Sequence, residues 1–143
     1  MRVWLVSDHA GYKLKHHLRR YLEGRYEVVD VGTFSEEATD YPQWVHQLMK
    51  EFDPAERAIL LCGTGNGVCM TANRYPQVRA ALAWNVEIAR LARAHNDANV
   101  LCLPARFLQP HEAEAIVETF LTTAFEGGRH ERRIAQINPP SCC

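Results

Sequence analysis

The stretch Ala58-Ile59-Leu60-Leu61-Cys62-Gly63-Thr64-Gly65-Asn66-Gly67 decides the fold class of this chain. Its run of apolar residues predicts a strand buried on both faces, and the glycine-rich turn predicts a helix that begins directly afterwards. A buried strand, a tight turn and a helix are the building blocks of parallel α/β sheets.

The same alternation of apolar runs and amphipathic stretches continues on both sides of this segment. It predicts a single doubly wound α/β domain, Rossmann- or flavodoxin-like, with about five parallel strands flanked by helices. The domain covers residues 1–137, and residues 138–143 form a C-terminal tail. We expect strands at 3–6, 28–31, 58–62, 79–83 and 99–103, and helices at 11–23, 41–52, after Gly67, at 85–94, from Pro110 to the glycines at 127–128, and from Arg129.

Composition excludes several classes of protein. The 143 residues carry a net charge of -1, with 47% hydrophobic and 23% charged residues. These values argue against a disordered chain and against a nucleic-acid binder that acts through bulk positive charge. No apolar run approaches the roughly 20 residues of a membrane span, and the first residues lack the pattern of a signal peptide. We therefore expect a cytoplasmic protein that binds neither membrane nor nucleic acid.

The five cysteines are odd in number and show neither a disulfide framework nor a CxxC pair. Cys142 and Cys143 lack the C-a-a-X pattern of a prenylation site, so we interpret them as part of a frayed terminus.

Polar residues follow two of the predicted strands, at the sheet edge where ligands bind in such folds. Ser7-Asp8-His9 follows the first strand, and the segment 62–67 follows the third. A helix N-terminus stabilises anions, so it could activate the Cys62 thiol and hold a developing oxyanion. Equally, Cys62 could be the inert end of a buried strand, with glycines that only make a turn.

Three known loop motifs do not fit residues 62–68. A P-loop requires Lys and Ser or Thr after the last glycine, but Val68 and Cys69 stand there. The spacing of Gly63, Gly65 and Gly67 departs from the dinucleotide fingerprint, and the arginine of a cysteine phosphatase is replaced by Val68.

Further candidates lie outside the glycine-rich loop. His95, placed by the pattern between a helix and a strand, is either a helix-end residue or a proton-transfer group. Arg129 and Arg133, four residues apart, share one helical face and could clamp a phosphate, although such segments are usually just solvated. Tyr41 belongs chiefly to a helix start, and its ring could also stack on a sugar.

Together these pieces resemble the ribose-5-phosphate isomerase B family, which also includes allose-6-phosphate isomerase and the galactose-6-phosphate isomerase subunits. The resemblance runs in order through residues 1 to about 137. The matching pieces are Ser7–Gly11, Gly32–Ser35, Thr39–Pro42, Cys62–Gly67, Ala72-Asn73, Arg79–Ala81, His95–Val100 and Gly127–His130.

The resemblance implies an aldose–ketose isomerase that interconverts ribose 5-phosphate and ribulose 5-phosphate through a cis-enediolate, without metal or cofactor. It implies that Cys62 is the base and that Thr64 and the loop amides hold the enediolate. Asp8 and His95 match ring-opening residues, and Asn96 matches a contact to a sugar hydroxyl. The implied substrate-binding set is His9, Tyr41, Gly63, Gly65, Asn66, Gly67, Asn96, Arg106, Arg129 and Arg133.

Two positions distinguish this chain within the family. One branch places a glutamate base just after the glycine loop, whereas this chain has Val68 there and retains Cys62. Pro104 stands where glycine is common, next to Arg106. The substrate could instead be a hexose 6-phosphate such as allose or galactose 6-phosphate. A non-catalytic phosphate- or nucleotide-binding module is a further alternative.

The chain direction predicts a shared active site. Asp8, His9 and Cys62 follow strands and belong to the carboxyl edge of the sheet, whereas His95 follows a helix that returns to the amino edge. A strand of about five residues spans roughly 17 Å, so His95 cannot readily reach its own Cys62. We therefore expect a homodimer in which each subunit completes its partner's site, or a tetramer of such dimers.

Overall fold

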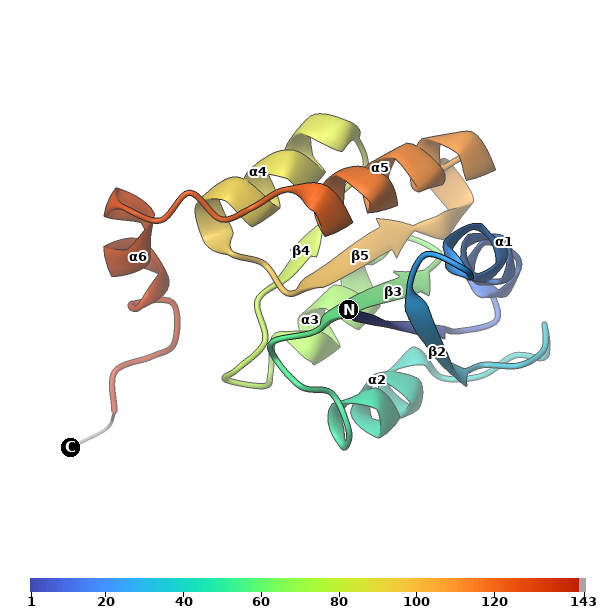
Figure 1. Ribbon diagram of the computed structural model, residues 1–143. Helices are drawn as coiled ribbons and strands as arrows, with labels where there is room; N and C mark the ends of the chain where they lie inside the picture. The colour runs from blue at the N-terminus through green and yellow to red at the C-terminus, as the bar shows by residue number, and fades with distance from the viewer. Residues whose placement is uncertain (142–143) are drawn as a thin grey trace.

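The computed structural model describes residues 1–141, and Cys142 and Cys143 lie outside the described residues. Five strands form one sheet between two layers of helices (Figure 1). The elements in chain order are β1 (Arg2–Ser7), α1 (Tyr12–Leu22), β2 (Glu27–Gly32), α2 (Tyr41–Met49), β3 (Arg57–Cys62), α3 (Asn66–Ala72), β4 (Ala80–Leu82), α4 (Val86–Asn96), β5 (Val100–Pro104), the 3₁₀ turn η1 (Ala105–Phe107), α5 (Pro110–Thr122) and α6 (Arg129–Ile134).

The sheet is parallel throughout and has the order β2-β1-β3-β5-β4. The predicted α/β fold with five parallel strands is therefore confirmed. From β1 the chain winds outward to β2 and then crosses to β3 on the other side. The carboxyl ends of β1 and β3 consequently flank the switch point at which open α/β sheets bind ligands.

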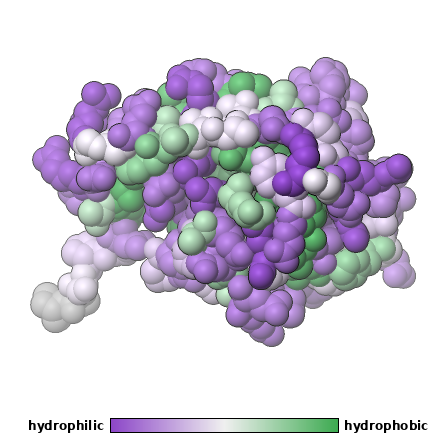
Figure 2. Space-filling view, in the orientation of Figure 1, coloured by the Kyte–Doolittle hydropathy of each residue, from purple (hydrophilic) through white to green (hydrophobic). Residues whose placement is uncertain are grey.

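Alternating strand residues supply two separate cores. Leu5, Ile59 and Leu101 point to one face and pack with α1, α4 and α5. Val6 and Leu60 point to the other face and pack with α2 and α3. All five side chains are fully buried, and burial of each contributes roughly 1.5–3 kcal/mol. In the view of Figure 2 the surface is predominantly hydrophilic, so on this side the elements turn their polar faces outward.

Three helix ends differ from the predicted boundaries by two residues or more, the first being that of α2, which ends at Met49 rather than at residue 52. Helix α4 continues to Asn96, so His95 lies in its last turn rather than in a loop. Helix α5 ends at Thr122, before the glycines that were expected to break it. The hydroxyls of Thr122 and Thr123 donate to the carbonyls of Glu118 and Thr119, at 2.7 and 2.6 Å. Such bonds compete with the helical pattern, and Thr123 already has extended backbone angles.

Helix α6 projects from the end of the domain near the last turn of α4 (Figure 1). Its connection to α5 is held there because the amide of Glu126 donates to the carbonyl of Ala94 at 3.0 Å. Farther along the chain, Asn138 donates to the carbonyl of Pro76 at 2.8 Å. Among the described residues, no helix combines the length and apolar character needed to cross a membrane.

Candidate functional site

The first polar group of the site follows β1. Asp8 is 6% exposed, and its carboxylate accepts a hydrogen bond from the amide of Gly11 at 3.1 Å, while its own amide donates to Leu61 at the end of β3. Beside it, Nδ1 of His9 accepts the amide of Thr39 at 3.2 Å. Since Nδ1 is the acceptor, the Nε2 of His9 carries the ring proton in the neutral form and is a donor.

Cys62 is the last residue of β3, and it is 4% exposed. Three residues, Gly63 to Gly65, separate it from the first helical residue of α3. Thr64 is exposed, and its hydroxyl oxygen accepts the amide of Asn66 at 3.3 Å. The loop therefore places a thiol, a hydroxyl and several backbone amides together at the carboxyl edge.

Close packing explains two glycines of this loop. Gly65 has φ +78°, and an added Cβ would lie 3.0 Å from the carbonyl carbon of Leu103. At Gly67 the ring of Tyr41 occupies the place of a side chain. Tyr41 begins α2, so its ring covers the start of α3 and borders the loop.

Arg106 lies against the same loop. Its amide donates to the carbonyl of Gly63 at 3.0 Å, and its guanidinium lies 3.0 Å from the position of a Cβ on Gly63. Pro104, which stands where glycine is common in the family, ends β5 in register with Cys62. The proline therefore does not prevent η1 and Arg106 from lying beside the glycine loop.

A buried lysine braces the connection between β2 and α2. Lys15 has no exposed side-chain surface and donates to Asp30 at 2.5 Å and to the carbonyl of Thr33 at 2.6 Å. Burial lowers the pKa of Lys15, and its bond to Asp30 opposes that shift. The amide of Thr33 in turn donates to Ser7 at 2.8 Å. These bonds fix the start of the β2–α2 connection, in which the amide of Thr39 donates to His9.

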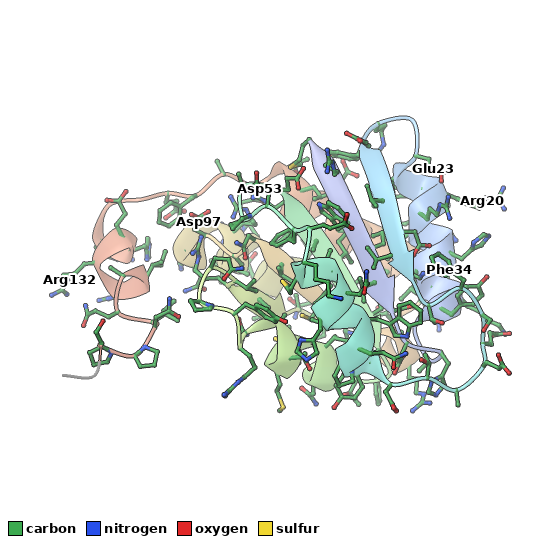
Figure 3. All side chains as sticks on the ribbon, turned by 90° about the horizontal axis from the view of Figure 1, so that it is seen from below. Arg20, Glu23, Phe34, Asp53, Asp97 and Arg132 are labelled. Carbon is green, nitrogen blue, oxygen red and sulfur yellow. The ribbon has the colours of Figure 1, made fainter. Side chains whose placement is uncertain are left out.

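The remaining predicted site residues lie at the opposite end of the sheet. The amide of Ala58, near the start of β3, donates to Asn99, three residues after Asn96. His95 and Asn96 thus lie at the amino end of the strand whose carboxyl end is Cys62. In Figure 3, Arg132 on α6 lies at one end of the molecule and Phe34, from the β2–α2 connection, at the other.

His95 is part of a cluster that the sequence analysis missed. Its ring stacks on that of His130, with centroids 4.3 Å apart and planes inclined by 16°. The Nε2 atoms of both rings lie 3.7 Å from the same carboxylate oxygen of Glu126. Burial and the charges of His95 and Arg129 lower the pKa of His130. The available signal in the sequence was the segment 127–130, in which Arg129 and His130 follow two glycines.

The predicted residues therefore form two groups within one chain. The carboxyl-edge group consists of Asp8, His9, Tyr41, Cys62, Gly63, Thr64, Gly65, Asn66, Gly67 and Arg106. The amino-edge group consists of His95, Asn96, Arg129 and Arg133, and both arginines are exposed on α6.

A second thiol lies close to the carboxyl-edge group. Cys69 of α3 is half-buried, and its Sγ donates to the carbonyl of Ala80 at 3.5 Å. A hydrogen bond with Cys102 lowers the pKa of Cys69, whereas burial raises the pKa of Cys102 well above its usual range. Cys69 is therefore a second candidate, beside Cys62, for a reactive thiol in this part of the molecule.

Comparison with known proteins decides the family. Residues 3–137 match the family described as Ribose/Galactose Isomerase. The chain belongs to the ribose/galactose isomerase family. Ribose-5-phosphate isomerase B of Escherichia coli is 40% identical over 139 residues, covering 95% of this chain and 93% of the relative.

Solved structures of family members agree with the fold. The ribose-5-phosphate isomerase B of Clostridium thermocellum superposes with a TM-score of 0.92 at 41% identity, covering 96% of this chain and 95% of that one. The Mycoplasma genitalium enzyme, solved with bound ribulose 5-phosphate, has a TM-score of 0.86 at 42% identity, covering 95% of this chain and 93% of that one. The resemblance inferred from the sequence motifs is thus confirmed at the level of the family.

Proposed function

We propose that this chain is a ribose-5-phosphate isomerase that interconverts ribose 5-phosphate and ribulose 5-phosphate in the pentose phosphate pathway. The observation that carries the proposal is the position of Cys62, beside the glycine loop at the switch point of a ribose/galactose isomerase fold. A thiol among converging amides suits proton transfer at carbon next to a developing oxyanion.

In the proposed reaction the thiolate of Cys62 removes the proton from C2 of the open-chain aldose and returns it to C1. The intermediate is a cis-enediolate, whose oxygens accept hydrogen bonds from Thr64 and from amides of the segment 63–67. Asp8 and His95 transfer the protons that open the furanose ring. Ring opening breaks the C1–O4 bond as O1 loses a proton and O4 gains one, and the isomerisation then moves one proton from C2 to C1 and one from O2 to O1. These steps balance without an external oxidant or reductant, and side chains that accept and donate protons suffice for them.

In the proposal, cationic and hydrogen-bond-donating side chains of the carboxyl-edge and amino-edge groups bind the phosphate. His9 presents its Nε2 proton at the carboxyl edge, and Arg106 lies beside the glycine loop. Arg129 and Arg133 supply guanidinium forks that match phosphate oxygens. Tyr41 lies against Gly67 at the end of the glycine loop, and in the proposed complex Asn96 donates to a sugar hydroxyl.

The separation of the two groups supports a homodimer with shared active sites. Cys62 and the His95 region lie at opposite ends of β3, so one sugar cannot contact both within a single chain. A two-fold partner that packs in the opposite sense brings its His95, Asn96, Arg129 and Arg133 to this Cys62. The projection of α6 from the domain fits a role in reaching the partner (Figure 1). A tetramer would pair two such dimers.

The proposed role of the Cys62 thiol also supports a cellular location for the protein. A base that acts as a free thiolate requires a reducing compartment, which supports the cytoplasm.

Complementation tests the shared site. Cys62→Ala and His95→Ala are each expected to be inactive, and co-expression makes about half of the dimers mixed, each with one intact site. Activity should then reach about a quarter of wild type. Mixed dimers that form and remain inactive would show that His95 does not serve the partner's Cys62.

A matched control places both substitutions in one chain and co-expresses it with wild type. With shared sites the mixed dimers are inactive, and about a quarter of the activity remains. With sites contained in one chain, about half would remain. Comparing kcat/KM for ribose 5-phosphate and allose 6-phosphate tests the pentose assignment, and a preference for the hexose would overturn it.

A further inference from the structure

The cluster of His95, Glu126 and His130 has the composition of a transition-metal site. The three residues offer two imidazole nitrogens and one carboxylate oxygen, which lie within 4.8 Å of one another. Two histidines and a carboxylate are a common donor set for Zn²⁺, with the fourth position left to water. Metal-free chemistry was proposed above for the isomerisation, so an ion here would have a different role.

The distances are close to those of coordination and do not correspond to hydrogen bonds. Each histidine Nε2 lies 3.7 Å from Glu126 Oε1, which is too long for a hydrogen bond. In a tetrahedral zinc site, ligand atoms at bonds of 2.0–2.2 Å lie about 3.4 Å apart. A contraction of a few tenths of an ångström would therefore bring the carboxylate and either ring onto one ion.

The two rings differ in their freedom to adjust. The side chain of His130 is 10% exposed, whereas that of His95 is 36% exposed. A metal lies in the plane of each imidazole that binds it, so two stacked rings cannot share an ion until one of them turns. His95 has the room to turn, and the bond from the amide of Glu126 to Ala94 keeps the carboxylate near α4.

The surrounding charges set the expected strength of binding. Arg129 and Arg133 lie close enough to influence His130, and their positive charges oppose a divalent cation. The carboxylate of Glu126 offsets part of this repulsion. We therefore expect zinc to bind more weakly here than at the same three ligands without neighbouring arginines.

We propose that His95, Glu126 and His130 bind a divalent ion of the zinc class, and that the bound ion inhibits the isomerase. The inhibitory part rests on the proposed function, in which His95 transfers a proton during ring opening. An ion on Nε2 of His95 occupies the lone pair that this transfer requires. The same ion ties α6 to the end of α4.

Zinc titration tests the site in the full chain, with Cys142→Ser and Cys143→Ser removing two competing thiols. Isothermal titration calorimetry measures Zn²⁺ binding, and the isomerase assay measures the zinc concentration for half-inhibition relative to each variant's own activity without zinc. His130→Asn and Glu126→Gln should each weaken binding and raise that concentration at least about tenfold. His46→Asn, which removes an exposed histidine bonded to Tyr75, should change neither.

The outcomes separate the metal site from the proposed function. Unchanged zinc affinity in both folded cluster variants would overturn the site and would place any inhibition elsewhere, for example on Cys62. Zinc that binds the cluster without lowering activity would overturn the inhibitory role. A chain that isomerises no sugar phosphate even in chelator would instead refute the proposed function, while calorimetry still tests the metal site.

Discussion

Replacing Gly65 by alanine probes the packing that shapes the glycine loop. With φ at +78°, a residue with a Cβ pays a backbone penalty of roughly 1–2 kcal/mol. The new Cβ would lie 2.5 Å from Cδ1 of Leu82 and 3.0 Å from the carbonyl carbon of Leu103. Leu82 can turn aside, but the backbone of Leu103 pairs with Leu61 in the sheet. Overpacking of this kind costs about 1–3 kcal/mol, so we expect a total of about 2–5 kcal/mol.

Gly24→Ala is the matched control, because Gly24 has φ +92° and no atom within 4 Å of an added Cβ. It should lower the free energy of unfolding by only the backbone part, roughly 1–2 kcal/mol. Urea unfolding followed by circular dichroism measures both, at one fixed protein concentration, because the proposed dimer would make stability depend on concentration. Equal losses for the two variants would refute the argument that Leu103 leaves no room for a Cβ at Gly65.

Two further predictions concern charged side chains. Arg129→Ala and Arg133→Ala should each raise KM for ribose 5-phosphate by about one to two decades, whereas the control Arg132→Ala, on the same helix, should leave KM unchanged. An unchanged KM in both of the first two variants would show that these arginines are solvated surface residues and do not bind phosphate. Lys15→Met should lower the free energy of unfolding by about 1–3 kcal/mol, because the 8% exposed Asp30 loses its ammonium partner and keeps only Arg19, at 3.6 Å, and the amide of Gly32; no measurable loss in urea unfolding would contradict this.

Local patterns in the sequence were sufficient to predict the sheet. The runs around Val3, Ile59 and Leu101 are apolar because both faces of a parallel sheet are covered, and that pattern is visible without a structure. The glycine loop after Cys62 was equally visible, since glycines at its positions follow from a positive φ and close packing.

Long-range contacts were beyond the reach of sequence patterns. The end of α5 was missed for a local reason, because hydroxyl bonds from Thr122 and Thr123 to carbonyls four residues earlier compete closely with the helix. The pairing of Lys15 with Asp30 and the meeting of His95 with Glu126 depend on how distant segments pack. Neither residue pair has a sequence spacing that indicates contact, so the buried lysine and the three-residue cluster are visible only in the folded structure.

The most direct test of the account is the kcat of Cys62→Ala for the conversion of ribose 5-phosphate to ribulose 5-phosphate, measured beside Cys69→Ala. Cys62 ends β3 at the glycine loop, whereas Cys69 lies one turn into α3 with its thiol bonded to Ala80. We predict that Cys62→Ala folds normally and loses at least about 10²-fold in kcat, the usual contribution of a positioned general base, while Cys69→Ala retains most of its activity. Nearly unchanged turnover by Cys62→Ala would contradict the assignment of Cys62 as the base.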